Sequence, residues 1–333
     1  MKICIIKLGA EGDVLRTIPI AKALKNKYKD SKITWITKPG IAELLENIQE
    51  IDEIATLPYK SKDSFDKLYN FDLDKEAVEL AKNINSKEKY GFTDADGYPS
   101  TFNLNAEYYL NTTYDDELKK SNKKTYQEMM LEVAELPYNK EKYHIILKDD
   151  EKQYAQEFIS KHKLHGKKII GIHMGASSRW PSKVWHSDRI KKFIKSAKNE
   201  GFEILLFGGP NEAEYHKELV LNLEKDGLNI HKNDPKNTKK QFASLVEICD
   251  VLVCSDSFAL HVSIGLGKKT IGLFFCTSPK EIEDYGLLKK IISKMLDNFF
   301  PEHMDKYNED LVKSITEEQV LSAIKEVLDN KKA

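Results

Sequence analysis

Cysteine is scarce in this sequence, and its spacing excludes several classes of protein. Only four cysteines occur in 333 residues, and no two of them form a CxxC pair. This pattern argues against a disulfide framework and against a structural zinc site. The thiols are expected instead to fill buried positions in a reducing compartment; they are Cys4, Cys249, Cys254 and Cys276.

The sequence also lacks an excess of charge of either sign. Its formal net charge is −1 although 32% of its residues are charged. Binding to the phosphates of nucleic acid needs a basic excess, so no nucleic-acid partner is expected. One local basic run either forms a solvated helix face or makes peripheral contact with an anionic membrane; it comprises Lys22, Lys25, Lys27, Lys29 and Lys32.

Long apolar runs are absent as well. No stretch approaches the roughly 20 apolar residues that a membrane-spanning helix needs. Met1 opens directly into a strand-like run, without the basic and apolar regions of a signal peptide. These absences predict a cytoplasmic protein.

What is present is a regular alternation of apolar strands and amphipathic helices. A length of 333 residues exceeds what one core usually supports, so two domains are expected, at 1–150 and 151–315, followed by a last helix within 316–333. The alternation predicts parallel sheets covered on both faces. The polar segment 94–124 is expected to be a long loop that shapes a binding site. We also expect a short strand at 143–147 and, at 270–275, the last strand of the second domain.

Four predicted strands of the second half end in small or hydroxyl-bearing residues. The segment Ser255–His261, with the sequence SDSFALH, leads from an apolar strand into a helix. A helix N-terminus binds anions, and a carboxylate accepts hydrogen bonds from sugar hydroxyls. The other three ends are Gly175–Pro181, Gly208–Pro210 and Cys276–Pro279. Ligands of open α/β sheets bind at the carboxyl ends of strands, so the four ends together predict a nucleotide or sugar-phosphate site.

Several side chains at these ends have two interpretations. His261 follows Ser257 by one helical turn, and it either binds phosphate or sugar or packs between helix and sheet. Arg179 and Lys183 either neutralise a diphosphate or are ordinary surface cations. The full set of candidate donor-binding residues is Gly175, Ser177, Ser178, Arg179, Lys183, Gly208, Gly209, Asp256, Ser257, His261 and Thr277.

The turn Gly9–Asp13 ends the first predicted strand and opens a helix. It is neither a dinucleotide fingerprint nor a Walker loop, and its two acids would repel a phosphate. Asp13 either caps the helix or serves as a general base. Two DxD strings, at 72–74 and 94–96, lie in the half without the phosphate-type loops, so no metal site is expected.

Five motifs, in order along the chain, resemble those of glycosyltransferase family 9, the ADP-heptose:lipopolysaccharide heptosyltransferases. The first, GDVLRTIP at Gly12–Pro19, is similar to the family's G-D-V-x-x-T-x-P element. The other four are Gly175–Pro181 followed by Trp185, Phe207–Glu212, Ser255–His261 and Phe274–Pro279. The resemblance covers most of the chain.

The resemblance implies a GT-B fold, in which two Rossmann-like, doubly wound domains face each other across a cleft. The first domain would bind a glycan or glycolipid acceptor such as lipopolysaccharide core, and the second an ADP-sugar, while the final helix crosses back to the first. The implied enzyme is an inverting, metal-independent glycosyltransferase that moves a sugar, heptose in the family, and needs no cofactor. It would be cytoplasmic, either in solution or peripheral to the cytoplasmic face of the inner membrane.

The resemblance also implies roles for individual residues. Asp13 would be the general base, with Gly12 and Arg16 on the acceptor side. Asp256 would hold donor hydroxyls or position the N-terminus of the helix that follows it. The leaving diphosphate would be stabilised by Arg179, Ser257, His261 and Thr277.

The chain departs from the family pattern at four positions. Ser178 stands where the family has lysine, Phe258 and Phe275 stand where it has glycine, and Glu11 replaces a small or apolar residue. Arg179 or Lys183 would supply the missing charge. These departures keep two alternatives open: a catalytically altered nucleotide-sugar-binding protein, and a transferase or epimerase that uses a different nucleotide sugar.

Overall fold

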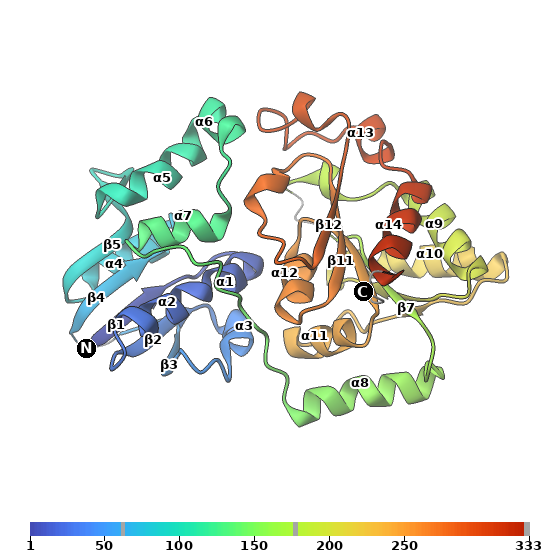
Figure 1. The fold of residues 1–333 in the computed structure, drawn as a ribbon, viewed down its shortest axis with the longest axis horizontal. Helices are drawn as coiled ribbons and strands as arrows, with labels where there is room; N and C mark the ends of the chain where they lie inside the picture. Colours follow the sequence, from blue (N-terminus) through green and yellow to red (C-terminus); the bar gives the residue numbers. More distant parts are fainter. Residues whose placement is uncertain (61–63, 176–178, 330–333) are drawn as a thin grey trace. The chain divides into compact units, whose positions relative to one another are not determined.

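The structure, a computed structural model, describes residues 1–60, 64–175 and 179–329. It divides into two compact units. The first comprises Met1–Ile146 with Lys280–Glu283, and the second comprises Leu147–Pro279 with Asp284–Ala333. Each unit is built on one six-stranded sheet with helices packed around it (Figure 1).

The sheet of the first unit has the strand order β3-β2-β1-β4-β5-β6. All neighbouring strands are parallel except the last pair, β5 and β6. Parallel strands are covered on both faces and therefore read as continuous apolar runs, as in KICII of β1. The strands are β1 (Lys2–Ile6), β2 (Lys32–Thr37), β3 (Glu53–Thr56), β4 (Phe65–Asn70), β5 (Ser86–Ala95) and β6 (Tyr98–Thr101).

Helices cover both faces of this sheet. Pro19 starts a second helix directly after the first, because proline lacks the N–H that the helix interior needs but suits the first turn. The core on one face joins alternate residues of β1 to Ala77 and Ala81 of α4, whereas α1, α2 and α7 pack together. The helices are α1 (Glu11–Thr17), α2 (Pro19–Lys27), α3 (Pro39–Ala42), α4 (Lys75–Asn83), α5 (Glu107–Tyr114), α6 (Asp116–Ser121) and α7 (Tyr126–Val133), with 3-10 turns η1 (Glu43–Leu45) and η2 (Leu104–Ala106).

The expected long loop at 94–124 is wrong. The segment forms the end of β5, the antiparallel β6, η2, α5 and α6. Asp96 and Gly97 both take positive φ angles, which suits a tight hairpin. The helix α6 buries none of its residues, so it lacks the apolar period that would have revealed it.

The expected strand at 143–147 is also wrong. The chain is extended there but belongs to no sheet. Tyr143, Ile145 and Leu147 are buried while the residues between them are exposed. Packing of one side of an extended chain therefore produced the alternation that the sequence shows.

The sheet of the second unit is entirely parallel, in the order β12-β11-β10-β7-β8-β9. The expectation that the strand at 270–275 closes this sheet is wrong, because β12 pairs with β11 beyond it. Two lysines in β12 (LKKII) hide its apolar pattern and are typical of an edge strand. The strands are β7 (Ile169–His173), β8 (Glu203–Phe207), β9 (His231–Lys232), β10 (Val251–Ser255), β11 (Lys269–Phe274) and β12 (Leu288–Ile292).

Two helical layers cover this second sheet. The helices α9, α10 and α14 share one core with alternate residues of the central strands, whereas α8 packs against α11, and α11 against α12 (Figure 1). The helices are α8 (Asp149–His162), α9 (Ser187–Asn199), α10 (Ala213–Lys225), α11 (Lys239–Glu247), α12 (Phe258–Gly265), α13 (Glu309–Lys313) and α14 (Glu317–Asp329). Short 3-10 turns are η3 (Pro181–Lys183), η4 (Pro210–Glu212), η5 (Pro279–Glu281) and η6 (Leu296–Asn298).

The final helix belongs to the second unit. We expected it to cross back to the first, but α14 packs on α9, and Glu317 forms an ion pair with Arg189 at 2.7 Å. Its buried residues Val320 and Ile324 are part of the second core.

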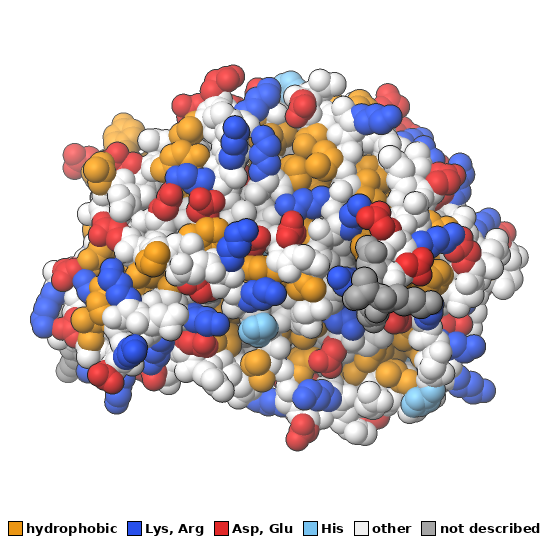
Figure 2. All heavy atoms as spheres, in the orientation of Figure 1, with side chains coloured by type: hydrophobic (Ala, Val, Ile, Leu, Met, Phe, Trp, Pro, Cys, Tyr) orange, Lys and Arg blue, Asp and Glu red, His pale blue; other side chains and the backbone are white. Residues whose placement is uncertain are grey.

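The surface mixes both charge signs, as the net charge near zero requires. Figure 2 shows basic and acidic side chains interspersed over the visible face. Within the basic run, Lys25 binds Asp52 at 2.6 Å and Lys27 donates to the Glu135 carbonyl at 3.2 Å. Among the described residues, no helix combines the length and apolarity needed to cross a membrane.

Candidate functional site

Asp13 lies just beyond the carboxyl end of β1, in the first turn of α1. Ala10 occupies the N-cap position and no side chain caps this helix, so Asp13 is not the cap. Its Oδ1 accepts a hydrogen bond from Arg16 Nε at 2.9 Å, and a second guanidinium nitrogen lies 2.7 Å away. The Asp13 side chain is 32% exposed. A guanidinium at this distance favours the charged form of a carboxylate, and this carboxylate still reaches solvent.

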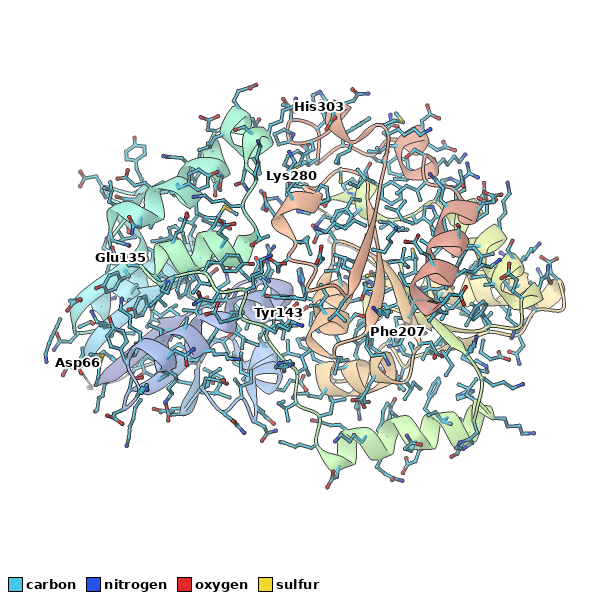
Figure 3. The ribbon with its side chains drawn as sticks, in the orientation of Figure 1. Asp66, Glu135, Tyr143, Phe207, Lys280 and His303 are labelled. Atoms are coloured by element: carbon cyan, nitrogen blue, oxygen red, sulfur yellow. The ribbon has the colours of Figure 1, made fainter. Side chains whose placement is uncertain are left out.

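Tyrosines surround Arg16. Its guanidinium lies 3.8 Å from the centre of the Tyr126 ring, and the Tyr109 ring meets Tyr126 edge-on at 5.9 Å. Burial raises the pKa of Tyr109, Tyr126 and Tyr143; Tyr143 is labelled in Figure 3. These phenols are therefore neutral, and they place the Asp13–Arg16 pair beside low-polarity surface where the ion pair is strong.

Lys7 is a second cation at this sheet edge, and sequence reasoning missed it. The side chain is 4% exposed, and its Nζ lies 2.6 Å from Asp72 Oδ1. This pairing engages the first acid of the string 72–74, while Asp94 of the second string binds Lys82 at 3.0 Å. The available signal was a lysine placed directly after a buried strand.

The first unit also contains a cavity of about 370 Å³. It is lined by Leu104, Asn105, Tyr108 and Glu132. Lys124 borders these residues, since its Nζ lies 4.1 Å from the Tyr108 ring centre and 2.7 Å from both Glu132 oxygens. An aromatic ring, a carboxylate and an amide together suit a polyhydroxylated ligand.

In the second unit, Lys183 and Asp256 meet at the end of β10. Lys183 Nζ donates to the Asp256 carbonyl and to its Oδ2, both at 3.0 Å. Asp256 Oδ1 lies 3.9 Å from His261 Nε2, and His261 is buried. The structure therefore brings together three of the predicted donor residues.

The charges of Lys183 and Asp256 also act on Cys276, which lies just beyond the end of β11. Burial raises the pKa of Cys276 to about 11, while the Lys183 charge lowers it and the Asp256 charge raises it. Thr277, the next residue, is 6% exposed. Arg179 takes a different position, exposed and with its guanidinium 4.6 Å from the Trp180 ring centre. Ser177 and Ser178 lie outside the described residues.

The ends of β7 and β8 carry neutral histidines and glycines. Ser257 Oγ lies 3.3 Å from His173 Nδ1. Burial lowers the pKa of His173 to about 4, with a smaller contribution from His216. Burial likewise lowers the pKa of His216 to about 4. Sequence reasoning missed both histidines, although His173 ends a strand and His216 lies in α10, the helix that follows a glycine-rich strand end.

The glycines here are required by close contacts. A Cβ on Gly208, which follows Phe207 (Figure 3), would lie 2.3 Å from the His216 ring. A Cβ on Gly175 would lie 2.9 Å from the Glu212 carboxylate, and Gly209 N donates to Glu212 Oε2 at 2.9 Å. Glu212 thus contacts two of the predicted glycines, Gly175 and Gly209. Like His173 and His216, it is a polar side chain to which the sequence analysis assigned no role.

The departures Phe258 and Phe275 have structural explanations. Phe258 packs on Phe242 of α11, with ring centres 5.6 Å apart. Phe275 is 1% exposed and belongs to the core that α9 and α14 share. Both rings therefore pack against other apolar side chains of the second unit.

Two doubly wound parallel sheets, each with ligand-type groups at its carboxyl edge, are the architecture of GT-B glycosyltransferases. The sequence profile of glycosyltransferase family 9 (heptosyltransferase) matches residues 80–309, more than half of the chain. The chain therefore belongs to glycosyltransferase family 9.

Individual relatives agree with this assignment. Lipopolysaccharide heptosyltransferase 1 of Campylobacter coli is 24% identical, over 98% of this chain and 99% of that protein. The crystal structure of a family 9 glycosyl transferase from Veillonella parvula is 20% identical and aligns with a TM-score of 0.80, covering 99% of this chain and 97% of the other. The ADP-heptose LPS heptosyltransferase II of E. coli is 17% identical and aligns with a TM-score of 0.73 over 100% of both chains.

Proposed function

We propose that this glycosyltransferase moves a heptose from ADP-heptose to a glycan acceptor of the lipopolysaccharide-core type. The observation that carries the proposal is family membership combined with an Asp13 that is paired with Arg16 and reaches solvent beyond the end of the first strand. The choice of donor and acceptor is supported by the names of the relatives in Campylobacter coli and E. coli.

The proposed reaction is a single displacement that inverts the anomeric carbon. Asp13 takes the proton from the acceptor hydroxyl as its oxygen bonds to that carbon, and the bond to the diphosphate breaks. Arg16 favours the ionised form of Asp13 before the reaction and orients it, and Gly12 lies beside it on the acceptor side. The electron pair leaves with ADP, so the second unit must stabilise growing negative charge.

Lys183 is the cation that we assign to the leaving diphosphate. It is held by Asp256 at the end of β10, where the N-terminus of α12 adds backbone N–H groups. Ser257, His261 and Thr277 supply polar side chains at the same strand ends, with Ser177 and Ser178 proposed from sequence alone. Arg179 stacks on Trp180, and we assign it a smaller contribution than Lys183 to stabilising the diphosphate.

The remaining donor contacts follow from the glycine-rich ends. Gly175 and Gly208 let Glu212 and His216 pack against the ends of β7 and β8, and Gly209 leaves room for a ligand to approach the backbone. The Glu212 carboxylate beside them can accept hydrogen bonds from ribose hydroxyls. Asp256, partly neutralised by Lys183, can accept from hydroxyls of the donor sugar.

We also propose that the reaction needs no metal ion. Within the described ranges, no three His, Cys, Asp or Glu residues are grouped so that they could hold one. Asp72 and Asp94, the first acids of the two DxD strings, are bound by lysines. In a metal-dependent transferase a cation neutralises the departing diphosphate, and here Lys183 would do so.

The cavity beside Tyr108 is our candidate for part of the acceptor. It lies in the same unit as Asp13, and Tyr109, adjacent to Tyr108 in α5, packs on the Tyr126 ring. A sugar ring can lie against an aromatic side chain while its hydroxyls bond to the carboxylate of Glu132 and the amide of Asn105.

An assay of ADP release tests the function. The purified chain is incubated with ADP-heptose and deacylated lipopolysaccharide core, and ADP and the glycan product are both measured. We expect acceptor-dependent ADP release that survives excess EDTA and exceeds release from UDP- and GDP-sugars. Donor binding without turnover would instead support a nucleotide-sugar-binding protein, and preference for UDP-sugars would support a different transferase. Loss of activity in EDTA that Mg²⁺ restores would contradict metal independence.

A further inference from the structure

Lys7 is buried at the sheet edge where Asp13 is placed. It follows β1 directly and is 4% exposed. Its Nζ donates to the Phe71 carbonyl at 3.1 Å and to Asp72 Oδ1 at 2.6 Å. Replacing such a buried pair by apolar residues often leaves stability unchanged or improves it, so stability alone does not explain its presence.

Asp72 connects the end of β4 to the turn that leads to Asp13. Its Oδ2 accepts hydrogen bonds from the backbone N–H groups of Leu8 and Gly9, the latter at 3.0 Å. A Cβ on Gly9 would lie 3.3 Å from Asp72 Oδ1 and 3.3 Å from Asp74 Oδ2. Glycine at position 9 therefore lets the carboxylate approach the turn closely.

Asp72 is itself held in place. Its backbone N–H donates to Asn70 Oδ1 at 3.1 Å, and Asn70 Nδ2 donates to the carbonyls of Asp72 at 3.0 Å and Phe92 at 2.8 Å. The chain from β5 through β4 to the turn after β1 is thus joined by hydrogen bonds. Such an arrangement fixes where α1 begins, and with it the position of Asp13.

The charge of Lys7 also acts on Asp13. Burial works to lower the pKa of Lys7, but Asp72 above all, with Tyr126, Asp13 and Tyr109, raises it well above the usual value. Lys7 is therefore a permanent cation. The charged and titratable groups around the turn are Asp72 and Asp74 after β4, Asp13 and Arg16 of α1, Tyr109 of α5 and Tyr126 of α7.

We propose that Lys7 and Asp72 are positioning residues for the acceptor-side base. Their buried pair holds the turn between β1 and α1 that places Asp13, and the Lys7 ammonium favours the ionised form of Asp13. This inference rests on the proposed role of Asp13 as the general base. Neither residue touches the substrate.

The test removes the pair while keeping its shape. The double variant Lys7→Met with Asp72→Asn leaves an amide oxygen to accept from the turn and leaves no unpaired buried charge. We expect kcat to fall about 10- to 100-fold, with KM for both substrates changed less than about threefold, because misplacement of a base affects the chemical step. The single variant Lys7→Met removes the cation alone, and we expect it to move the acid limb of the kcat–pH profile about one pH unit higher, because a positive charge near Asp13 is lost.

The matched control is Lys67→Met. Lys67 is a buried lysine of the same sheet, in β4, paired with Glu88 and 3.1 Å from the Tyr90 hydroxyl. It should lower thermal stability without moving the acid limb. The variant Lys7→Arg keeps the charge and should keep the limb in place, even where kcat falls.

Four outcomes separate this inference from the proposed function. A folded double variant with wild-type kcat overturns the positioning role, and a folded Lys7→Met variant with an unmoved acid limb overturns the electrostatic role. An equal shift of the limb in Lys67→Met overturns its specificity. If Asp13→Asn itself retains full activity, the assignment of the base fails first, whatever the Lys7 variants show.

Discussion

The carboxyl edges of the two sheets carry different kinds of side chain. At the carboxyl edge of the first, charged side chains are paired and surrounded by tyrosines: Asp13 with Arg16, and Lys7 with Asp72. At the edge of the second, glycines and neutral histidines dominate, and Lys183 with Asp256 is the charged pair of the described donor residues.

The difference follows from what each edge is proposed to do. A general base must be ionised and held in one orientation. Nearby cations favour its ionised form, and the ion pair and the surrounding buried phenols hold it in place. A donor site must let a diphosphate approach the backbone and then stabilise charge that appears during the reaction, so it keeps small residues and hydrogen-bond donors. One scaffold thus carries two functions through its strand ends alone.

The strongest test of the comparison is Asp13→Asn. We expect turnover to fall about 10²- to 10⁴-fold, the usual range for a general base, with donor affinity unchanged by calorimetry. Glu11→Gln, in the same helical turn, is the matched control and should stay close to wild type. Near-normal turnover in Asp13→Asn would leave the first edge without a catalytic role.

The second test compares the two cations of the donor side. Lys183→Met should weaken binding of ADP or an ADP-sugar about 10- to 100-fold, because charge-assisted hydrogen bonds to phosphate are lost. Arg179→Met should change the dissociation constant less than about threefold, since its guanidinium stacks on Trp180. The reverse order in titration calorimetry would assign the missing family lysine to Arg179.

A smaller effect is expected at the acceptor cavity. Tyr108→Ala should raise KM for the acceptor about 3- to 10-fold through loss of an aromatic contact, with KM for the donor unchanged. Tyr114→Ala is the control, because Tyr114 lies in the same helix, is 64% exposed and does not line the cavity. Equal effects in both variants would remove the cavity from the acceptor site.

The smallest effect concerns stability at acid pH. The pKa of His216 is lowered by burial from 6.5 to about 4, so its neutral form stabilises the fold at neutral pH. The unfolded chain binds the proton more readily, and this stability is lost as pH falls from about 6.5 toward 4, by roughly 3 kcal/mol at most.

His216→Leu should therefore make the fall in unfolding free energy over this pH window shallower, measured by denaturant titration at several pH values. His303→Leu is the control, since His303 is exposed (Figure 3). An unchanged pH slope in His216→Leu would mean that His216 titrates normally in the folded protein.

Parts of the fold were predictable because they are periodic. The interior strands β1, β7 and β10 are continuous apolar runs, and the buried residues of α9 recur at helical spacing. The sequence did not reveal β12, α5 and α6, which are short or polar. Their residues suit a surface or a sheet edge rather than a core.

The candidate site was predictable to a similar extent. Asp256 directly follows an apolar strand, and Asp13 and His261 lie in the helices that come next, so their position at a sheet edge could be expected from the sequence. Glu212 and His216 could not be linked to Gly175 and Gly208, because those contacts join the ends of different strands. Lys7 and Asp72 lie 65 positions apart, and only the pairing of β1 with β4 brings them together.

The sequence by itself therefore determined the alternation of strands and helices, the two doubly wound sheets, and the polar residues that end the strands. These properties follow from local periodicity and from the identity of single residues. Only the tertiary structure decided that Lys183 rather than Arg179 meets Asp256, and that Lys7 is buried against Asp72. Those choices depend on strand order and on the competition between nearby partners, and no local pattern in a chain encodes either.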